Sequence, residues 1–184
     1  MRIAIYSRGL EITQREEIDL LLQELKKQNV EPVFFQDFFN QFYSAIDIKG
    51  NYSTFNSSSD MDDSIDCMIS LGGDGTLLDT VTFVKDTGIP VLGINYGRLG
   101  FLANIGKEEL QSAIEALVNR QFVTAKRTLL HLDANIPLVG DTPYALNEFS
   151  LPKKDSSPMI KIHTYLNGEL LNTYWADGLI AATP

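Results

Sequence analysis

A carboxylate stands inside a glycine-rich turn near the middle of the chain. Residues 72–76 read Gly-Gly-Asp-Gly-Thr, so Asp74 has a glycine on either side. Glycine lets the backbone approach a ligand closely, and N–H groups at a helix start attract anions. A carboxylate here would repel a phosphate, but it can serve as base for a hydroxyl or meet a metal ion. The pattern predicts a polar ligand site; the plainer alternative is a tight turn whose Asp74 caps a helix.

The residues around this turn predict the elements that hold it. Residues 65–71 form an apolar run, typical of a strand, and residues 77–84 place leucine and valine at helical spacing. Residues 89–94 predict the next strand, and the loop at residues 95–100 contains two glycines. Because ligands of open α/β sheets bind at the carboxyl edge, we expect this loop to lie beside the glycine turn.

The start of the chain predicts a parallel crossover unit. Residues 3–6 are continuously apolar, as in a central parallel strand with both faces buried. Residues 13–16 form a capping box, and leucine and isoleucine recur at helical spacing over residues 18–25. A second strand is expected at residues 33–35, and a further amphipathic helix at residues 108–118.

Two stretches differ from this alternation. The aromatic residues within 38–43 predict a short helix, and the Ser/Asn-rich residues 51–60 predict a mobile loop. We consider the hypothesis that this loop forms a lid over a nucleotide. From residue 122 onward the pattern predicts strands: residues 124–136 and 160–166 alternate, and Asn-Gly at 167–168 indicates a hairpin.

The expected organisation is therefore α+β. An α/β domain, a Rossmann-like parallel sheet flanked by helices, covers residues 1–122, and the beginning of an all-β domain covers residues 123–184. His131 and His163 fall on predicted strands and lack a second ligand at metal spacing, so we expect neither to bind a metal.

Composition excludes several classes of function. The 184 residues are 44% hydrophobic and 21% charged, which is typical of a globular protein. The net charge of −9 argues against a broad nucleic-acid interface. Cys67 is the single cysteine and lies in an apolar run, which indicates a buried side chain and a reducing compartment. Neither a signal peptide nor a membrane span is evident, so we expect a cytoplasmic protein without membrane partners.

Several motifs together carry a family resemblance. Residues 72–76 resemble the GGDGT signature shared by NAD kinases, diacylglycerol and sphingosine kinases and, more remotely, 6-phosphofructokinases. Asn147 and Glu148 are similar to the NE motif of NAD kinases, and residues 177–184 to the start of their third conserved stretch. Residues 93–102 also resemble the Gly-rich loop of that family. These matches, in the right order, favour NAD kinase.

The resemblance implies a reaction and a set of site residues. NAD kinases transfer the γ-phosphoryl group of ATP, with a divalent metal such as Mg²⁺, to the 2′-hydroxyl of the adenosine ribose of NAD, giving NADP. Asp74 would then be the catalytic base. The implied binding residues for the nucleotides are Gly73, Gly75, Thr76, Phe101, Asn147, Glu148 and Asp177. No residue is assigned as a metal ligand. The family's β domain is longer, so we expect a C-terminally truncated chain and, for the full protein, a homo-oligomer.

Some residues differ from the NAD kinase pattern, and other classes of protein remain as alternatives. Many family members have a basic residue where Asp79 stands, so we assign Asp79 no phosphate contact. Arg98 lies in the loop near the site, where it is either a source of positive charge or, as we slightly favour, an exposed loop residue. A lipid kinase is one alternative, although the chain shows no basic amphipathic helix. A non-catalytic NAD(P)-binding module is the other. A Rossmann dehydrogenase is excluded because no G-x-G-x-x-G follows the first strand.

Overall fold

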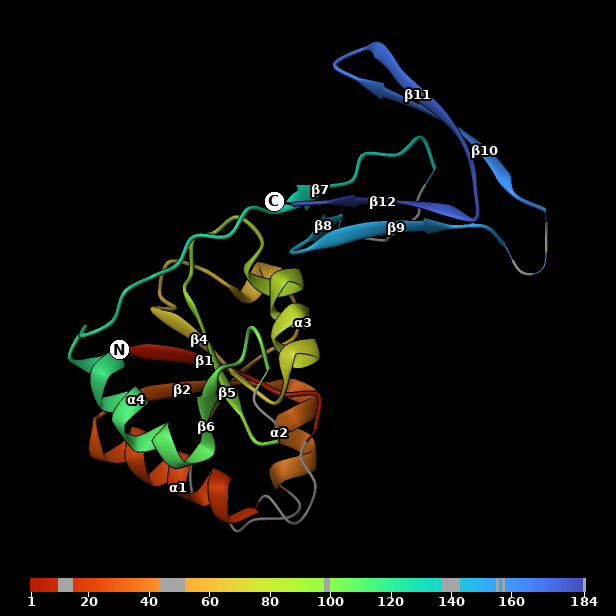
Figure 1. Ribbon diagram of the computed structural model, residues 1–184. Helices are drawn as coiled ribbons and strands as arrows, with labels where there is room; N and C mark the ends of the chain where they lie inside the picture. Colours follow the sequence, from red (N-terminus) through yellow and green to blue (C-terminus); the bar gives the residue numbers. More distant parts are fainter. Residues whose placement is uncertain are drawn as a thin grey trace. The chain divides into compact units, whose positions relative to one another are not determined.

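The strand that begins at Arg2 lies inside a six-stranded parallel sheet in the computed structural model (Figure 1). The structure describes residues 1–9, 15–43, 52–97, 100–136, 143–154, 156 and 158–183. The chain divides into two compact units, Met1–Ala125 and Lys126–Pro184. The elements of the first unit are β1 (Arg2–Tyr6), α1 (Arg15–Lys27), β2 (Glu31–Phe35), α2 (Gln36–Tyr43), β3 (Ser53–Phe55), the 3₁₀ helix η2 (Ser58–Asp60), β4 (Cys67–Leu71), α3 (Asp74–Val84), β5 (Val91–Asn95), β6 (Ile105–Gly106), η3 (Lys107–Glu109) and α4 (Leu110–Val118).

The sheet has the order β3-β2-β1-β4-β5-β6, and all its pairings are parallel. Ile3, Ala4 and Ile5 of β1 are fully buried, because helices cover both faces of the sheet. The predicted Rossmann-like α/β architecture is confirmed. The capping box expected before α1 lies partly outside the described residues.

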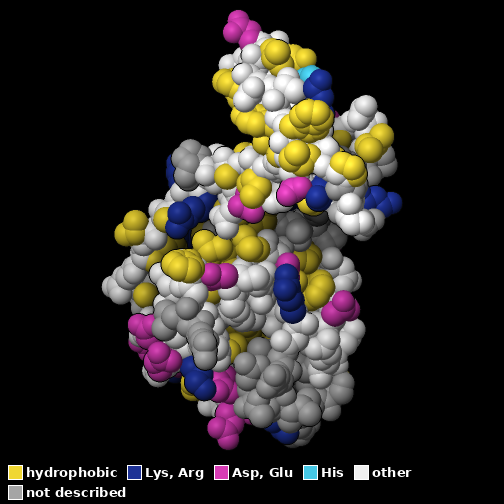
Figure 2. All heavy atoms as spheres, turned by 45° about the vertical axis from the view of Figure 1, so that its right-hand side comes forward, with side chains coloured by type: hydrophobic (Ala, Val, Ile, Leu, Met, Phe, Trp, Pro, Cys, Tyr) yellow, Lys and Arg dark blue, Asp and Glu magenta, His cyan; other side chains and the backbone are white. Residues whose placement is uncertain are grey.

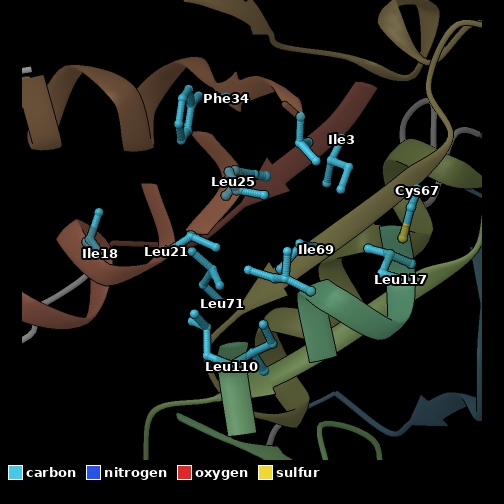
Figure 3. Close-up of a cluster of buried hydrophobic side chains, with 14 of the residues drawn as sticks. Ile3, Ile18, Leu21, Leu25, Phe34, Cys67, Ile69, Leu71, Leu110 and Leu117 are labelled. Carbon is cyan, nitrogen blue, oxygen red and sulfur yellow. The ribbon is translucent and has the colours of Figure 1, made fainter. Parts of the chain in front are cut away.

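Helices α1, α2 and α4 cover one face, where the larger hydrophobic cluster lies (Figure 3). Leu21 and Leu25 of α1 point toward Ile69 of β4, and α4 contributes Leu110 and Leu117. Helix α3 covers the other face and packs Phe83 and Val84 against Ala4 and Met68. The glycine turn therefore connects a central, buried strand to a helix that is anchored at its far end.

The predicted mobile loop at residues 51–60 is wrong. Ser53–Phe55 form the edge strand β3, which pairs in parallel with β2, and Ser58–Asp60 form a 3₁₀ turn. Phe55 is buried and anchors this otherwise polar segment. The backbone of the segment forms the edge strand of the sheet. This segment belongs to the sheet, and the lid hypothesis is therefore withdrawn.

The second unit consists of antiparallel strand pairs. They are β7 (Leu130–His131) with β8 (Tyr144–Ala145), β9 (Glu148–Pro152) with β12 (Gly178–Ala182), and β10 (Ile160–Leu166) with β11 (Glu169–Ala176). Asn167 and Gly168 both have positive φ, 52° and 87°, which confirms the predicted hairpin. The strand predicted over residues 124–136 is largely wrong, since only Leu130–His131 is a strand there.

The surface of the second unit is unusually apolar. Figure 2 shows hydrophobic side chains gathered over these strands, and the exposed ones include Leu166, Leu170, Leu171, Trp175 and Ile180. Within the described part of the chain, every helix is too short or too polar to cross a membrane. The domain boundary at residue 122 remains a prediction.

Candidate active site

The glycine turn is shaped by the residue that follows β4. Gly72 has φ +151°, and a Cβ at this position would lie 2.3 Å from Oγ1 of Thr76. Helix α3 begins at Asp74, with Gly73 as an N-cap that offers no side-chain acceptor. The carbonyl of Gly73 accepts the N–H groups of Thr76 and Leu77, at 3.0 and 3.1 Å. The turn therefore requires a glycine at position 72, and the bare backbone of Gly73 leads into the helix.

The carboxylate of Asp74 is bound by the backbone of a second loop. Its Oδ1 accepts the N–H groups of Leu102 and Ala103, both at 2.9 Å, and its Oδ2 accepts the N–H of Phe101 at 2.8 Å. Hydrogen bonds from Ala103, Leu102 and Phe101 lower the pKa of Asp74 below its ordinary value. The group is therefore a fixed carboxylate anion at neutral pH. It does not cap its own helix through its side chain, contrary to the plainer alternative.

Gly100 gives the carboxylate its space. A Cβ on Gly100 would lie 2.1 Å from Oδ1 of Asp74 and 2.5 Å from Cγ. Gly100 N–H donates to the carbonyl of Ala103 at 3.3 Å, which closes the loop around the acid. The loop after β5 therefore lies beside the glycine turn, as predicted, while Arg98 lies outside the described residues.

The other predicted residues of this unit differ in their exposure. Gly75 is exposed, and a Cβ on Gly73 would meet no atom within 4 Å. The side chain of Phe101 is 97% exposed, so an aromatic ring stands free beside the carboxylate. Thr76 is buried, and its hydroxyl lies under Gly72. Thr76 thus supports the turn, and a ligand contact by Thr76 remains a prediction.

An ion pair lies along the outer side of α3. Arg8 donates from Nε and Nη2 to the two carboxylate oxygens of Asp79, the Nη2 bond being 2.6 Å. Tyr6 Oη donates to Oδ2 of Asp79 at 2.9 Å. Burial raises the pKa of Asp79, but the hydrogen bonds from Arg8 and Tyr6 outweigh burial and lower it overall. Asp79 therefore pairs with the guanidinium of Arg8, and its exclusion from the binding residues remains a prediction.

The predicted residues of the second unit lie at the two ends of one strand pair. Asn147 precedes β9 and its carbonyl accepts the N–H of Thr183 at 2.9 Å, while Glu148 is the first residue of β9. Asp177 precedes β12 at the other end and forms a 2.8 Å ion pair with Lys153. β9 has five residues, which corresponds to roughly 13 Å. The pair Asn147–Glu148 is thus separated from Asp177 along this ribbon.

Among the described residues, the histidines and acids form no metal-binding cluster. His131 packs against the ring of Tyr144, and Nδ1 of His163 lies 2.8 Å from Oγ1 of Thr173. No group of three or more His, Cys, Asp or Glu residues in the described ranges could hold a metal ion. Mg²⁺ in phosphoryl-transfer sites is commonly held by few protein ligands and by substrate phosphates. We therefore assign no protein ligand to the metal and derive no step through it.

Sequence reasoning missed Arg8, Gly100 and the amides of residues 101–103. The backbone N–H groups of residues 101–103 have no sequence signature. The glycine at position 100, just before them, could have indicated that the backbone approaches another group closely there. Arg8 follows β1 directly, and β1 and β4 are parallel with Tyr6 opposite Ser70. A residue two places beyond Tyr6 had to reach the edge where the glycine turn lies.

Comparisons with known proteins match this chain to one family. A family model described as the ATP-NAD kinase N-terminal domain matches residues 7–122. An NAD kinase of Flavobacterium johnsoniae is 41% identical over 186 residues, and one of Bacteroides fragilis is 38% identical over 184. Each match covers 100% of this chain and 63% of the relative, so the chain spans less than two thirds of their length.

A solved structure shows the same fold. The yeast NADH kinase complexed with NADH matches with a TM-score of 0.79 and 23% identity, over 99% of this chain and 57% of that chain. The family match extends over most of the first unit, including the glycine turn, α3 and the loop that binds Asp74. On this evidence the chain belongs to the NAD kinase family.

Proposed function

We propose that the complete protein is an NAD kinase, which transfers the γ-phosphoryl group of ATP to the 2′-hydroxyl of the adenosine ribose of NAD. The observation that carries the proposal is the carboxylate of Asp74, held by three amides at the start of α3. Family membership and the relatives named NAD kinase support the choice of substrates. The reaction forms a bond from the ribose oxygen to the γ-phosphorus and breaks the bond from that phosphorus to the ADP oxygen.

Asp74 has capacity left for the hydroxyl. An ionised carboxylate offers about four acceptor sites, and the three amides use three of them. In our proposal the remaining site accepts the hydrogen bond of the 2′-hydroxyl and then its proton. A low pKa makes Asp74 a weak base, but the loose transition state of phosphoryl transfer depends mainly on positioning and charge stabilisation. Asp74 therefore acts chiefly by orienting the attacking oxygen.

The remaining predicted residues bind the two nucleotides. The backbone of the half-buried Gly73 and of the exposed Gly75 donates to the phosphates, because helix N-terminal amides lack intrahelical acceptors. The free ring of Phe101 provides a surface on which an aromatic base can stack. Asn147 and Glu148 bind ribose hydroxyls or the nicotinamide end.

Asp177 would meet another ribose or amide group of NAD. Because it lies at the other end of the β9–β12 ribbon from Asn147 and Glu148, one ligand can contact both ends only in an extended form. Mg²⁺ would accompany the phosphates of ATP. Homo-oligomerisation and a cytoplasmic location complete the proposal.

The comparisons give the lipid-kinase alternative no support. A non-catalytic NAD(P)-binding protein stays as the second candidate, because the three amide hydrogen bonds to Asp74 could also serve only to hold the loop after β5 against the glycine turn. Turnover separates these two candidates.

The test is the formation of NADP from ATP and NAD by the complete gene product and by its Asp74→Asn variant. We expect the variant to lose turnover by roughly a factor of 10² or more while it still binds NAD, because the NH₂ group of asparagine cannot accept the backbone N–H groups that position the side chain, and the attacking oxygen loses its orientation. Asp62→Asn is the matched control: Asp62 accepts the backbone N–H of Ser64 at 2.9 Å and lies near Arg2, which begins β1 at the opposite edge of the sheet. Full turnover by Asp74→Asn would remove Asp74 from the reaction.

A further inference from the structure

Arg8 lies at the same sheet edge as the glycine turn and faces it with one nitrogen. Its Nη1 lies 3.4 Å from the position that a Cβ on Gly75 would occupy. Gly75 and Asp79 are four residues apart on α3, so they share one face of the helix. The guanidinium therefore lies along that face and spans the distance from the Asp79 carboxylate to the exposed backbone of Gly75.

The ion pair divides the guanidinium into two parts. Nε and Nη2 donate to Asp79, while Nη1 is the nitrogen nearest to Gly75. Asp79 is itself held by Tyr6, a buried residue whose ring contacts Phe35 and Phe83. A buried tyrosine thus fixes a carboxylate, which in turn fixes an arginine whose side chain is 60% exposed.

We propose that Arg8 is a further binding residue for the phosphate chain of the phosphoryl donor, with Asp79 and Tyr6 as its positioning residues. The inference rests on the proposed function for the location of the donor beside Gly73 and Gly75. The Nη1 group carries two N–H donors of a planar fork, which suit phosphate oxygens.

Asp79 balances the charge of Arg8, so the contribution of Arg8 is a directed hydrogen bond rather than net attraction. Because Asp79 already fixes the Arg8 side chain, Arg8 loses less side-chain entropy when the phosphoryl donor binds. This explains how a site in a protein of net charge −9 could bind a polyanion without a cluster of free cations.

The test measures the binding of magnesium ATP by calorimetry to the complete gene product and to three variants. Loss of a charge-assisted hydrogen bond predicts about tenfold weaker ATP binding for Arg8→Ala. Arg8→Lys, which keeps the charge but not the fork, should fall between Arg8→Ala and the wild type. Arg2→Ala is the matched control. Arg2 lies at the start of β1, at the end of the strand opposite to Arg8, and forms a 3.1 Å ion pair with Glu31. NAD binding should be unchanged in all three.

The outcomes separate the two proposals. ATP binding by Arg8→Ala within about twofold of the wild type, or an equal loss of NAD binding, would overturn the role of Arg8. A wild-type protein that binds ATP but forms no NADP would refute the kinase proposal, and the comparison of variants would still decide the role of Arg8. A wild-type protein that fails to bind ATP would refute both. In the kinase assay, Arg8→Ala should raise the KM for ATP and leave the KM for NAD unchanged.

Discussion

Replacing Gly100 with alanine is the most direct test of how the carboxylate is held. The new Cβ would lie 2.1 Å from Oδ1 of Asp74, whereas ordinary contacts begin near 3.4 Å. The strain therefore falls on the carboxylate, which must move by more than 1 Å, the difference between those two distances.

That displacement breaks the hydrogen bonds from Phe101, Leu102 and Ala103. The Asp74 side chain is partly exposed, so water replaces much of what is lost, and we expect the free energy of unfolding to fall by only about 1 to 2 kcal/mol. Turnover is more sensitive, because a misplacement of about 1 Å at a reacting group costs roughly 10²-fold. Gly100→Ala should thus lower kcat about a hundredfold in a protein that stays folded.

The assay is NADP formation at saturating ATP and NAD, together with urea unfolding. Gly97→Ala is the matched control, because it lies in the same loop and its Cβ would have Oδ1 of Asn95, at 3.6 Å, as nearest neighbour. We expect Gly97→Ala to keep wild-type kcat. If Gly100→Ala retains the kcat of Gly97→Ala, the amide-bound carboxylate is not what sets the rate.

Four further results follow from the same geometry. The pKa of Asp74 is lower in the folded than in the unfolded chain, so its contribution to stability is complete above the ordinary pKa of 3.8 and is lost as the pH falls through the folded pKa. In urea titrations, the difference in free energy of unfolding between wild type and Asp74→Asn should therefore shrink below pH 3.8. A difference that stays constant with pH would contradict this. Phe101→Ala should leave the free energy of unfolding within about 0.5 kcal/mol and weaken NAD binding roughly tenfold; unchanged calorimetric affinity would exclude stacking on this ring. Burial raises the pKa of Cys67 to about 12, so a thiol reagent should label it only after denaturation, and rapid labelling of the native protein would show that the strand opens. Gly93→Ala would place its Cβ 2.9 Å from Cα of Ala103 and should cost about 1 to 3 kcal/mol of stability, and a variant as stable as wild type would show that the loop moves freely.

Features with a local signature were predictable from the sequence. Apolar runs with short breaks indicated β1, β4 and β5, and the glycine turn between β4 and α3 was correctly placed. Asn167 and Gly168 identified a hairpin because both positions of this turn need positive φ. The proximity of the loop after β5 to Asp74 followed from parallel pairing, which brings the carboxyl ends of neighbouring strands together.

Features held by non-local or backbone contacts were not predictable. β3 lies in a Ser/Asn-rich stretch, and its strand character comes from pairing with β2 and from the burial of Phe55. Conversely, residues 124–136 alternate like a strand, but only Leu130–His131 pairs, with β8. The parallel pairing of β1 and β4 could have placed Arg8 at the edge of the glycine turn, but its ion pair with Asp79 joins residues far apart in sequence and has no local sequence pattern.

The structure also resolves why a carboxylate can stand in a turn that would bind phosphate. Three amides from the loop after β5 stabilise the charge of Asp74, so no cation is needed to keep it ionised. The side chain of Asp74 turns away from its own helix to the neighbouring loop, so it does not occupy the amides at the start of α3. If the proposed kinase function holds, two sets of backbone donors would serve two anions, and the acid and the phosphate would not compete for the same hydrogen bonds. On this view the spacing between α3 and the loop after β5, set by the glycines at 93 and 100, determines whether the hydroxyl and the γ-phosphorus can meet.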